Sequence, residues 1–189
     1  MSKKVIIYNA PPFSGKDEAA AIQKNEPSTR LMFKEQLINL TALIHGLTRD
    51  EFDALYTREL KETPTPIFFG LSPRQALIKV SEEVIKPNYG KDYFGKALAT
   101  QIEKSERDFI EVSDGGFIEE IAPIYDIINP SDLMIVRIHR PGCNYAGDSR
   151  SYLKDEDLHP DTHVFDLYND GSLDEFHGKI LNIADSFFK

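Results

Sequence analysis

Short apolar runs alternate along the chain with longer segments in which apolar residues recur every three or four positions. The apolar runs predict strands at residues 5–8, 30–33, 109–112, 133–138 and 164–168. The helical spacing predicts helices at residues 17–24, 35–45, 48–60, 72–85, 91–104 and 173–187. Strands that alternate with helices are typical of a parallel sheet covered on both faces. The pattern therefore predicts an α/β protein.

Local signals mark where two of these helices begin. Thr48-Arg49-Asp50-Glu51 has the form of a capping box. In a capping box, the first side chain accepts a hydrogen bond from the backbone N–H of the last residue, and the last side chain accepts one from the backbone N–H of the first. Ser72 followed by Pro73 is a serine N-cap with proline at the first helical position. The sequence contains no repeat, low-complexity segment or domain boundary, so we expect one domain over residues 1–189.

Charge and composition narrow the possible partners. The chain carries 22 basic and 31 acidic residues, which gives a net charge of −9. A surface that binds nucleic acid needs an excess of lysine and arginine, so we expect no nucleic-acid partner, whereas a small anion needs only a local basic cluster. The single cysteine, Cys143, excludes an internal disulfide and a cysteine-rich zinc site.

The apolar runs also bear on location. The longest runs, at residues 5–8 and 133–136, are far too short to span a bilayer. The basic start of the chain is followed by an apolar run that breaks at Asn9 and Pro11, so it does not have the form of a secretory signal. We therefore expect a cytoplasmic protein without a membrane partner.

Residues 3–17, with the sequence KKVIIYNAPPFSGKD, contain the strongest chemical signal. A strand, a turn of small residues and a helix follow one another, and the segment approaches the phosphate-binding pattern G-x-x-x-x-G-K-[ST]. In such a loop, backbone N–H groups, the positive end of the helix and a lysine surround an anion. Ala10 replaces the first glycine and Asp17 the terminal hydroxyl residue. The alternative is an ordinary strand-to-helix turn.

Several motifs together resemble the deoxynucleoside monophosphate kinases of tailed bacteriophages, within the wider nucleoside monophosphate kinase group. The first motif is Ser14-Gly15-Lys16-Asp17, a variant that is common in that family. The others, in chain order, are Ser72-Pro73-Arg74-Gln75, Tyr89-Gly90-Lys91-Asp92-Tyr93-Phe94, Ser113-Asp114-Gly115-Gly116-Phe117, Arg137-Ile138-His139-Arg140 with Gly147-Asp148-Ser149-Arg150, and Asn169-Asp170-Gly171-Ser172-Leu173.

The resemblance implies a fold and an activity. The fold is a three-layer α/β/α P-loop kinase fold with a five-stranded parallel sheet, a helical acceptor-binding region at 35–104 and a lid at 140–153. The activity is transfer of the γ-phosphate of ATP, with Mg²⁺, to a nucleoside or deoxynucleoside monophosphate. A homodimer is an open alternative to a monomer. Two other functions are alternatives: another small-molecule kinase, of the dephospho-coenzyme A or phosphomevalonate type, and a non-catalytic nucleotide-binding protein.

The resemblance also implies residues for the donor nucleotide and the metal. The expected donor-binding residues are Phe13, Ser14, Gly15, Lys16, Asp17 and Glu18. Asp17 and Asp114 are the two candidates for holding magnesium, because carboxylate oxygens are its preferred ligands. The alternatives are an acid in the first helical turn for Asp17 and a turn residue for Asp114.

Arginines near the expected lid are the remaining catalytic candidates. Arg140 and Arg150 flank residues 141–149, and Asp148 is placed to orient one of them. A lid arginine that arrives on closure stabilises the transition state more than the ground state. The alternative is a surface loop with ordinary salt bridges. Arg137 lies within a strand, where it must face a polar cleft or be paired, and we expect the cleft.

The acceptor site has a further set of candidates. Phe33 and Lys34 follow the second strand, and Arg74 is suited to clamp a phosphate with two hydrogen bonds. Asp114 is expected at the same site, and Tyr93 and Phe94 are either base-stacking or core residues. Adenylate-kinase-like relatives have an arginine shortly after Asp114, whereas this chain has Gly116-Phe117-Ile118.

Overall fold

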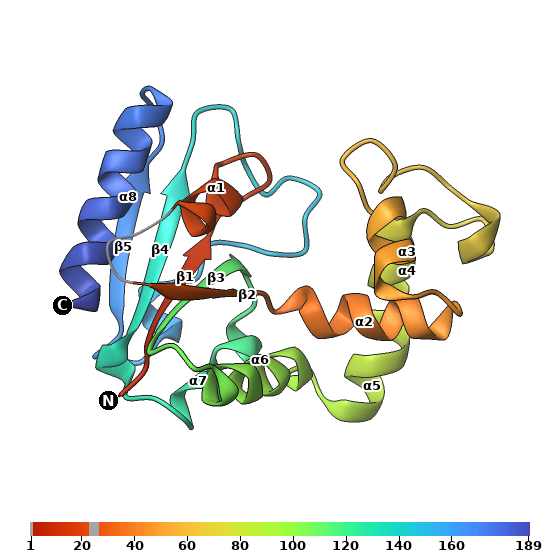
Figure 1. Cartoon of the computed structure of the whole chain (residues 1–189), viewed down its shortest axis with the longest axis horizontal. Helices are drawn as coiled ribbons and strands as arrows, with labels where there is room; N and C mark the ends of the chain where they lie inside the picture. Colours follow the sequence, from red (N-terminus) through yellow and green to blue (C-terminus); the bar gives the residue numbers. More distant parts are fainter. Residues whose placement is uncertain (1, 23–26) are drawn as a thin grey trace.

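A five-stranded parallel sheet is the centre of the computed structural model, which describes residues 2–22 and 27–189. The strand order is β2-β3-β1-β4-β5, and every neighbouring pair is parallel (Figure 1). The strands are β1 (Lys4–Asn9), β2 (Ser28–Leu31), β3 (Phe109–Gly115), β4 (Leu133–His139) and β5 (His163–Tyr168). The carboxyl ends of these strands meet at one edge of the sheet, where α/β proteins bind ligands.

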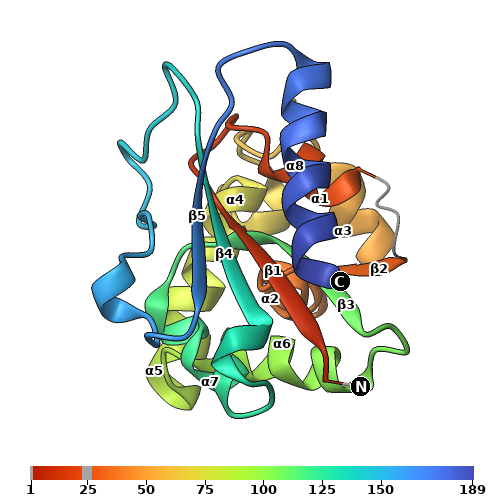
Figure 2. The same ribbon diagram turned by 90° about the vertical axis from the view of Figure 1, so that its left-hand side faces the viewer.

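Alternate residues of β1 face opposite sides of the sheet, and each side has its own core. Val5 and Ile7 belong to the cluster that packs against α6 (Tyr93–Lys104) and α7 (Ala122–Tyr125). Ile6 and Tyr8 belong to the cluster that packs against α1 (Lys16–Ala21) and α8 (Leu173–Phe188). Figure 2 shows α8 and α1 beside β1, with α6 and α7 across the sheet. The three-layer α/β/α architecture expected from the sequence is confirmed.

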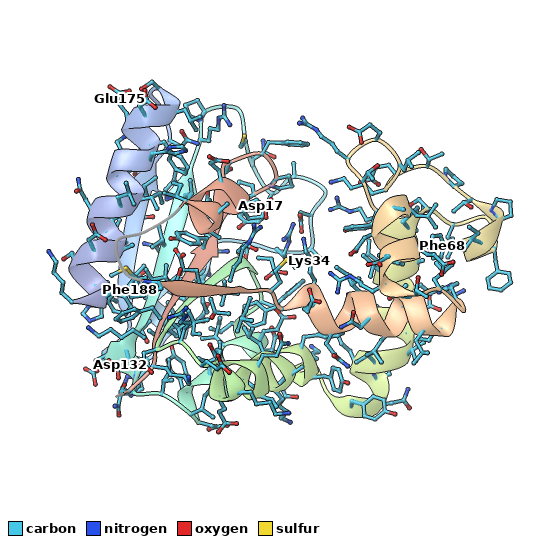
Figure 3. The ribbon with its side chains drawn as sticks, viewed as in Figure 1. Asp17, Lys34, Phe68, Asp132, Glu175 and Phe188 are labelled. Carbon is cyan, nitrogen blue, oxygen red and sulfur yellow. The ribbon has the colours of Figure 1, made fainter. Side chains whose placement is uncertain are left out.

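A second unit of helices extends from the end of β2, and we call it the helical lobe. It contains α2 (Lys34–Ile44), α3 (Arg49–Leu55), α4 (Pro73–Lys79), a π-helical turn (Val80–Ile85) and α5 (Lys86–Tyr89). The lobe has its own apolar core around Phe52 and Phe68. Figure 3 shows how far Phe68 lies from Phe188, which packs on the opposite side of the molecule. The segment predicted as helical, 35–104, thus divides between this lobe and α6.

Several expected element boundaries differ from the structure, including those of β3, which runs to Gly115 rather than residue 112, and α6, which begins at Tyr93 rather than residue 91. Strand β2 ends at Leu31 rather than at residue 33, because Phe33 already has helical backbone angles and leads into α2. Helix α3 ends at Leu55 rather than near residue 60, where the Thr57 hydroxyl accepts a hydrogen bond from the Leu60 N–H. Such local bonds compete with helix formation.

The helix that starts at Ser72 also differs from the expectation. It continues past residue 85 through the π-helical turn into α5, and Pro87 lies directly after that turn. Local departures from α-helical geometry of this kind accompany proline within a helix. The last residues of the expected helix 17–24 lie outside the described residues, and the described helix ends at Ala21. Both expected helix starts, the Thr48 capping box and the Ser72 N-cap, are confirmed. None of the helices in the described ranges has the length and apolarity to cross a bilayer.

Gly95 provides a test of how tightly α6 packs. A Cβ at Gly95 would lie 2.3 Å from the backbone oxygen of Glu120, whereas a Cβ at Gly178 in α8 would meet no atom within 4 Å. We expect Gly95→Ala to destabilise the protein by about 1–3 kcal/mol through overpacking. Gly178→Ala should stabilise it by roughly 0.5–1 kcal/mol. Urea unfolding of both variants measures this difference, and wild-type stability of Gly95→Ala would contradict the packing.

Candidate active site

A cavity of about 1350 Å³ lies between the carboxyl edge of the sheet and the helical lobe. We call it the cleft. Its volume exceeds the roughly 300–1,000 Å³ that is usual for a site with one small ligand. The basic residues that line it are Lys16, Lys34, Arg58, Lys61, Arg74, Lys86, Arg140 and Arg150. The acidic ones are Asp17, Glu18, Glu82, Asp114, Glu120 and Asp148. The cleft is therefore net positive in a chain whose net charge is −9.

The loop between β1 and α1 forms one wall of the cleft. Phe13 and Gly15 have left-handed backbone angles, with φ of 66° and 102°. A Cβ at Gly15 would lie 2.9 Å from the Asn169 side-chain nitrogen, which itself donates a hydrogen bond to the Ser14 carbonyl at 2.9 Å. The positive φ and the close approach together require glycine at position 15. The loop is thus held against the segment that leads into α8.

The structure places most of the expected donor-binding residues on this wall. Phe13, Gly15, Lys16, Asp17 and Glu18 line the cleft. Ser14 is not among the lining residues, and its buried hydroxyl has no hydrogen-bond partner among the described residues. Burial lowers the pKa of Lys16, because a desolvated ammonium is less stable. The nearby cations Arg150 and Lys34 lower it further.

Arg140 contacts the same loop from the segment that follows β4. Its guanidinium donates a hydrogen bond to the Phe13 carbonyl at 3.0 Å. On the other side, the Arg58 guanidinium of the helical lobe lies 5.3 Å from the Phe13 ring centre. Phe13 therefore links the loop to both flanking segments.

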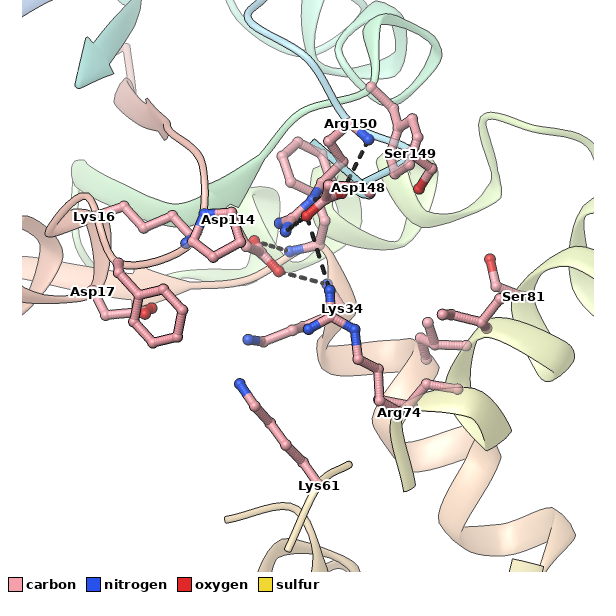
Figure 4. A pocket seen from close by; sticks show the side chains of 18 of the residues that line it. Lys16, Asp17, Lys34, Lys61, Arg74, Ser81, Asp114, Asp148, Ser149 and Arg150 are labelled. Atoms are coloured by element: carbon pink, nitrogen blue, oxygen red, sulfur yellow. Dashed lines mark hydrogen bonds and ion pairs between the residues drawn. The ribbon is translucent and has the colours of Figure 1, made fainter. Parts of the chain in front are cut away.

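Asp114 joins the sheet to the helical lobe. Its two carboxylate oxygens accept hydrogen bonds from the backbone N–H groups of Phe33 and Lys34, at 2.8 and 3.1 Å (Figure 4). These N–H groups lie at the start of α2, where helices have unsatisfied donors. Burial raises the pKa of Asp114, and the Lys34 cation and the two N–H groups oppose that rise. Asp114 therefore acts as a cap that fixes Lys34 at the cleft.

Arg150 already lies inside the cleft and does not need to arrive by a closing motion. Its Nε and Nη2 donate to the two oxygens of Asp148, at 2.9 and 2.6 Å. Its aliphatic part covers Gly116, where a Cβ would come within 2.9 Å of the Arg150 Cβ. The Asp148 side chain is only 8% exposed, and hydrogen bonding from Arg150 lowers its pKa to about 2. The prediction that Asp148 orients an arginine is confirmed.

Asp148 also approaches an arginine of the helical lobe. Arg74 Nη2 lies 3.9 Å from the Asp148 Oδ2, and its Nη1 donates to Glu62 at 3.2 Å. Figure 4 shows Arg74, Lys34 and Lys61 directed toward the same space below Asp114 and Arg150. The cleft thus brings together the expected residues Lys34, Arg74 and Arg150 from distant parts of the chain.

One expectation about a site residue is wrong. Arg137 does not line the cleft: its Nε donates to Asp166 at 2.9 Å and its Nη1 to Asp155 at 2.6 Å. Asp166 of β5 and Asp155 of the segment between β4 and β5 satisfy Arg137, so the paired alternative holds. For Tyr93 the core alternative holds, because it is absent from the lining and packs edge-on against Phe94 with ring centres 5.3 Å apart. Phe94 lines the cleft and is also part of a buried apolar cluster.

The sequence did not single out five charged residues of the cleft. These residues are Arg58, Lys61, Glu82, Lys86 and Glu120. Arg58 and Lys61 lie in the loop where α3 ends earlier than expected, and Lys86 lies beyond the expected helix end. A signal existed only for Glu120, which follows the Asp114 motif within the same loop. Apart from it, these residues reach the cleft through tertiary folding of the helical lobe.

Glu120 is a buried carboxyl at the cleft. It is 5% exposed, and no hydrogen bond or ion pair connects its side chain to any other described residue. Burial raises its pKa to about 8, and the negative charge of Asp114 contributes to the rise. No group of three or more His, Cys, Asp or Glu side chains in the described ranges is arranged to hold a metal ion.

The comparisons with known proteins do not indicate a function for this chain. No protein-family model matches the chain, and no curated protein matches it. Among solved structures, the chain is similar to the crystal structure of TT1252 from Thermus thermophilus. The identity is 14% over 98% of both chains, and the TM-score is 0.47. A likeness of this size carries no information about function.

The raised pKa of Glu120 predicts how stability depends on pH. The folded protein keeps a proton on Glu120 between pH 4.5 and about 8, whereas the unfolded chain loses it above pH 4.5. Unfolding should therefore become easier as the pH rises through this window, by at most about 1.4 kcal/mol per pH unit. Glu120→Gln should show a shallower decrease. Urea unfolding of both proteins at pH 5.5 and 8 tests this, and parallel pH profiles would show that Glu120 ionises normally.

Proposed function

We propose that the protein is a nucleoside monophosphate kinase, which transfers the γ-phosphate of ATP to a nucleoside or deoxynucleoside monophosphate. One observation carries the proposal: a single cleft has basic side chains on two facing walls, one from the loop before α1 and one from the helical lobe. If two phosphorylated ligands bind between these walls, cations surround the phosphate groups of each ligand. The resemblance of the sequence motifs to phage deoxynucleoside monophosphate kinases points to the same activity.

The loop wall suits the donor nucleotide. Lys16 and Arg140 are the cations there, and the first N–H groups of α1 have no partner within the helix. ATP phosphates bound at this wall would be held as in other phosphate loops. Asp17, 65% exposed at the start of α1, is the carboxylate that would hold Mg²⁺ together with the ATP phosphates. Both oxygens of Asp114 accept N–H bonds, which favours a positioning role for Asp114 over a metal-binding one.

The opposite wall suits an acceptor phosphate. Lys34, Arg74 and Arg150 surround the space below Asp148. Arg150 uses two of its five N–H donors on Asp148, so three are left for a phosphate. A phosphate monoester carries nearly two negative charges at neutral pH, which these cations would balance.

Such a transfer needs no general base. A phosphate oxygen of the acceptor attacks the γ-phosphorus, the bond from that phosphorus to the β,γ-bridging oxygen breaks, and ADP leaves. The attacking oxygen is already deprotonated, so the protein must position two anions and stabilise the charge on the migrating group. Lys16 and Arg150 are the cations that the structure offers for this role.

Two other functions follow from the sequence analysis. A different small-molecule kinase, of the dephospho-coenzyme A or phosphomevalonate type, would use the same phosphate loop with another acceptor. A non-catalytic nucleotide-binding protein would not need an arginine held at the centre of the cleft, and Arg150 therefore favours catalysis. The proposal further assigns the protein to the cytoplasm, which is the host's if the gene is viral, and leaves both monomer and homodimer open.

The direct test is a coupled ADP-release assay with ATP and Mg²⁺ against a panel of ribo- and deoxyribonucleoside monophosphates. We expect Lys16→Ala to lower turnover by several orders of magnitude without unfolding the protein, because Lys16 stabilises developing charge. Lys104→Ala, at an exposed position of α6, is the matched control and should keep full activity. Near-normal turnover of a folded Lys16→Ala protein would reject the donor site.

Arg150 requires a paired design, because its removal also leaves the buried Asp148 without its main partner. We expect Arg150→Ala to lower kcat and kcat/KM together by about 10²–10³-fold, and to destabilise the protein by roughly 1–3 kcal/mol through the unpaired carboxylate. The double variant Asp148→Ala/Arg150→Ala should recover stability but not turnover. Recovery of both would assign Arg150 a structural role only. Arg150→Lys should not restore turnover, since a lysine cannot donate two parallel bonds.

A further inference from the structure

Glu120 is the acidic side chain of the cleft that has no hydrogen bond or ion pair to another described side chain. The other five acids are paired: Asp114 caps α2, Asp148 holds Arg150, Glu82 accepts from Lys86, Glu18 contacts His177, and Asp17 lies 3.5 Å from Arg30. The Glu120 side chain lines the cleft, where a bound ligand can supply the hydrogen bonds that the described residues do not.

Aromatic side chains near Glu120 fit a planar ring. Phe117, three residues earlier, lines the cleft, and so does Phe94, which is next to the Gly95 that contacts the Glu120 backbone. The charged residues Lys86 and Asp114 also line this part of the cleft, and the other basic residues provide the phosphate positions. Aromatic walls with a few polar groups are typical of sites that bind an aromatic heterocycle.

We propose that Glu120 recognises the base of the acceptor nucleotide through its carboxyl group, by donating one hydrogen bond and accepting another. This inference rests on the proposed kinase function and names how the acceptor is bound. The pairing edge of each nucleobase presents a donor next to an acceptor. A protonated carboxyl group complements either order, because the proton can sit on either oxygen. Glu120 would therefore strengthen the binding of acceptors that carry a nucleobase and would accept several different bases.

The charged groups around Glu120 support the protonated form. Asp114 at the end of β3 and the adjacent Glu119 disfavour its ionisation, while Lys86 of α5 and Arg150 oppose them. Lys86 is engaged elsewhere, since it bonds Glu82 and lies 4.5 Å from the Phe117 ring centre. Helix α6 contributes the uncharged Phe94 and Gly95 on this side. With its pKa raised to about 8, Glu120 keeps its proton at neutral pH.

The test compares three variants at the same cleft. At pH 7, Glu120→Gln keeps a donor and an acceptor and should leave the KM for deoxynucleoside monophosphates within about threefold of wild type. Glu120→Leu loses both and should raise that KM by about 10- to 100-fold, which corresponds to roughly 1.4–2.8 kcal/mol. The matched control is Glu103→Leu at an exposed position of α6 outside the cleft lining, which should leave KM unchanged. Thermal unfolding checks that each variant is folded.

Two further measurements test the inference. The first separates the contribution of the base from that of the rest of the acceptor, and the second separates the protonated from the ionised form of Glu120. With deoxyribose 5-phosphate as the acceptor, which has no base, wild type and Glu120→Leu should have equal KM values. Between pH 7 and 9 the phosphate of the acceptor stays ionised, whereas Glu120 loses its proton. The wild-type KM should therefore rise over this range. The ratio of the wild-type KM to the KM of Glu120→Gln should follow the ionisation of Glu120 alone.

The possible failures are distinct. If the wild type transfers phosphate but Glu120→Leu keeps its KM, the role of Glu120 is wrong and the kinase function stands. If Glu120→Gln is as impaired as Glu120→Leu, the ionised carboxylate is needed and the protonated form is rejected. An equal loss with deoxyribose 5-phosphate would move the contact to the sugar and overturn recognition of the base. A wild type that phosphorylates no monophosphate rejects the kinase function and this inference with it.

Discussion

The two hydrogen bonds from the N–H groups of Phe33 and Lys34 to Asp114 hold the cleft together. They connect the carboxyl end of β3 to the first turn of α2, and the helical lobe continues from that turn. A carboxylate at a helix start satisfies donors that the helix itself cannot satisfy. Because the contact lies at the base of the lobe, it sets how α2 leaves the sheet. It thereby sets the distance between the loop that precedes α1 and the cations of the lobe.

The cleft concentrates basic side chains in an acidic chain. A chain with a net charge of −9 repels anions at long range, yet eight basic side chains line one cavity. Five of them come from the helical lobe: Lys34, Arg58, Lys61, Arg74 and Lys86. They face a loop that contributes Lys16. Like charges at such density need counter-ions. Asp148 supplies one between Arg74 and Arg150, and Glu82 supplies one for Lys86.

The sequence predicted what depends on local patterns and missed what depends on packing. The alternation of strands and helices, the helix starts at Thr48 and Ser72, and the strand-turn-helix around Gly15 are short-range signals, and the structure confirms them. Arg137 was misjudged because its partner Asp166 lies on the neighbouring strand, in a register that the sequence does not reveal. Arg58 and Lys61 were missed because α3 ends early and the chain turns back toward the cleft.

Gly116 and Arg150 lie far apart in the sequence and fit together in the structure. The segment directly after Asp114 has no basic residue, and Gly116 has no side chain. The space above Gly116 is filled by the aliphatic part of Arg150, which leaves no room for a Cβ. An arginine from the loop after β4 thus reaches the position beside Asp114 from the opposite direction. A cation therefore lies near Asp114 although the segment that contains Asp114 carries none, because the loop after β4 supplies it.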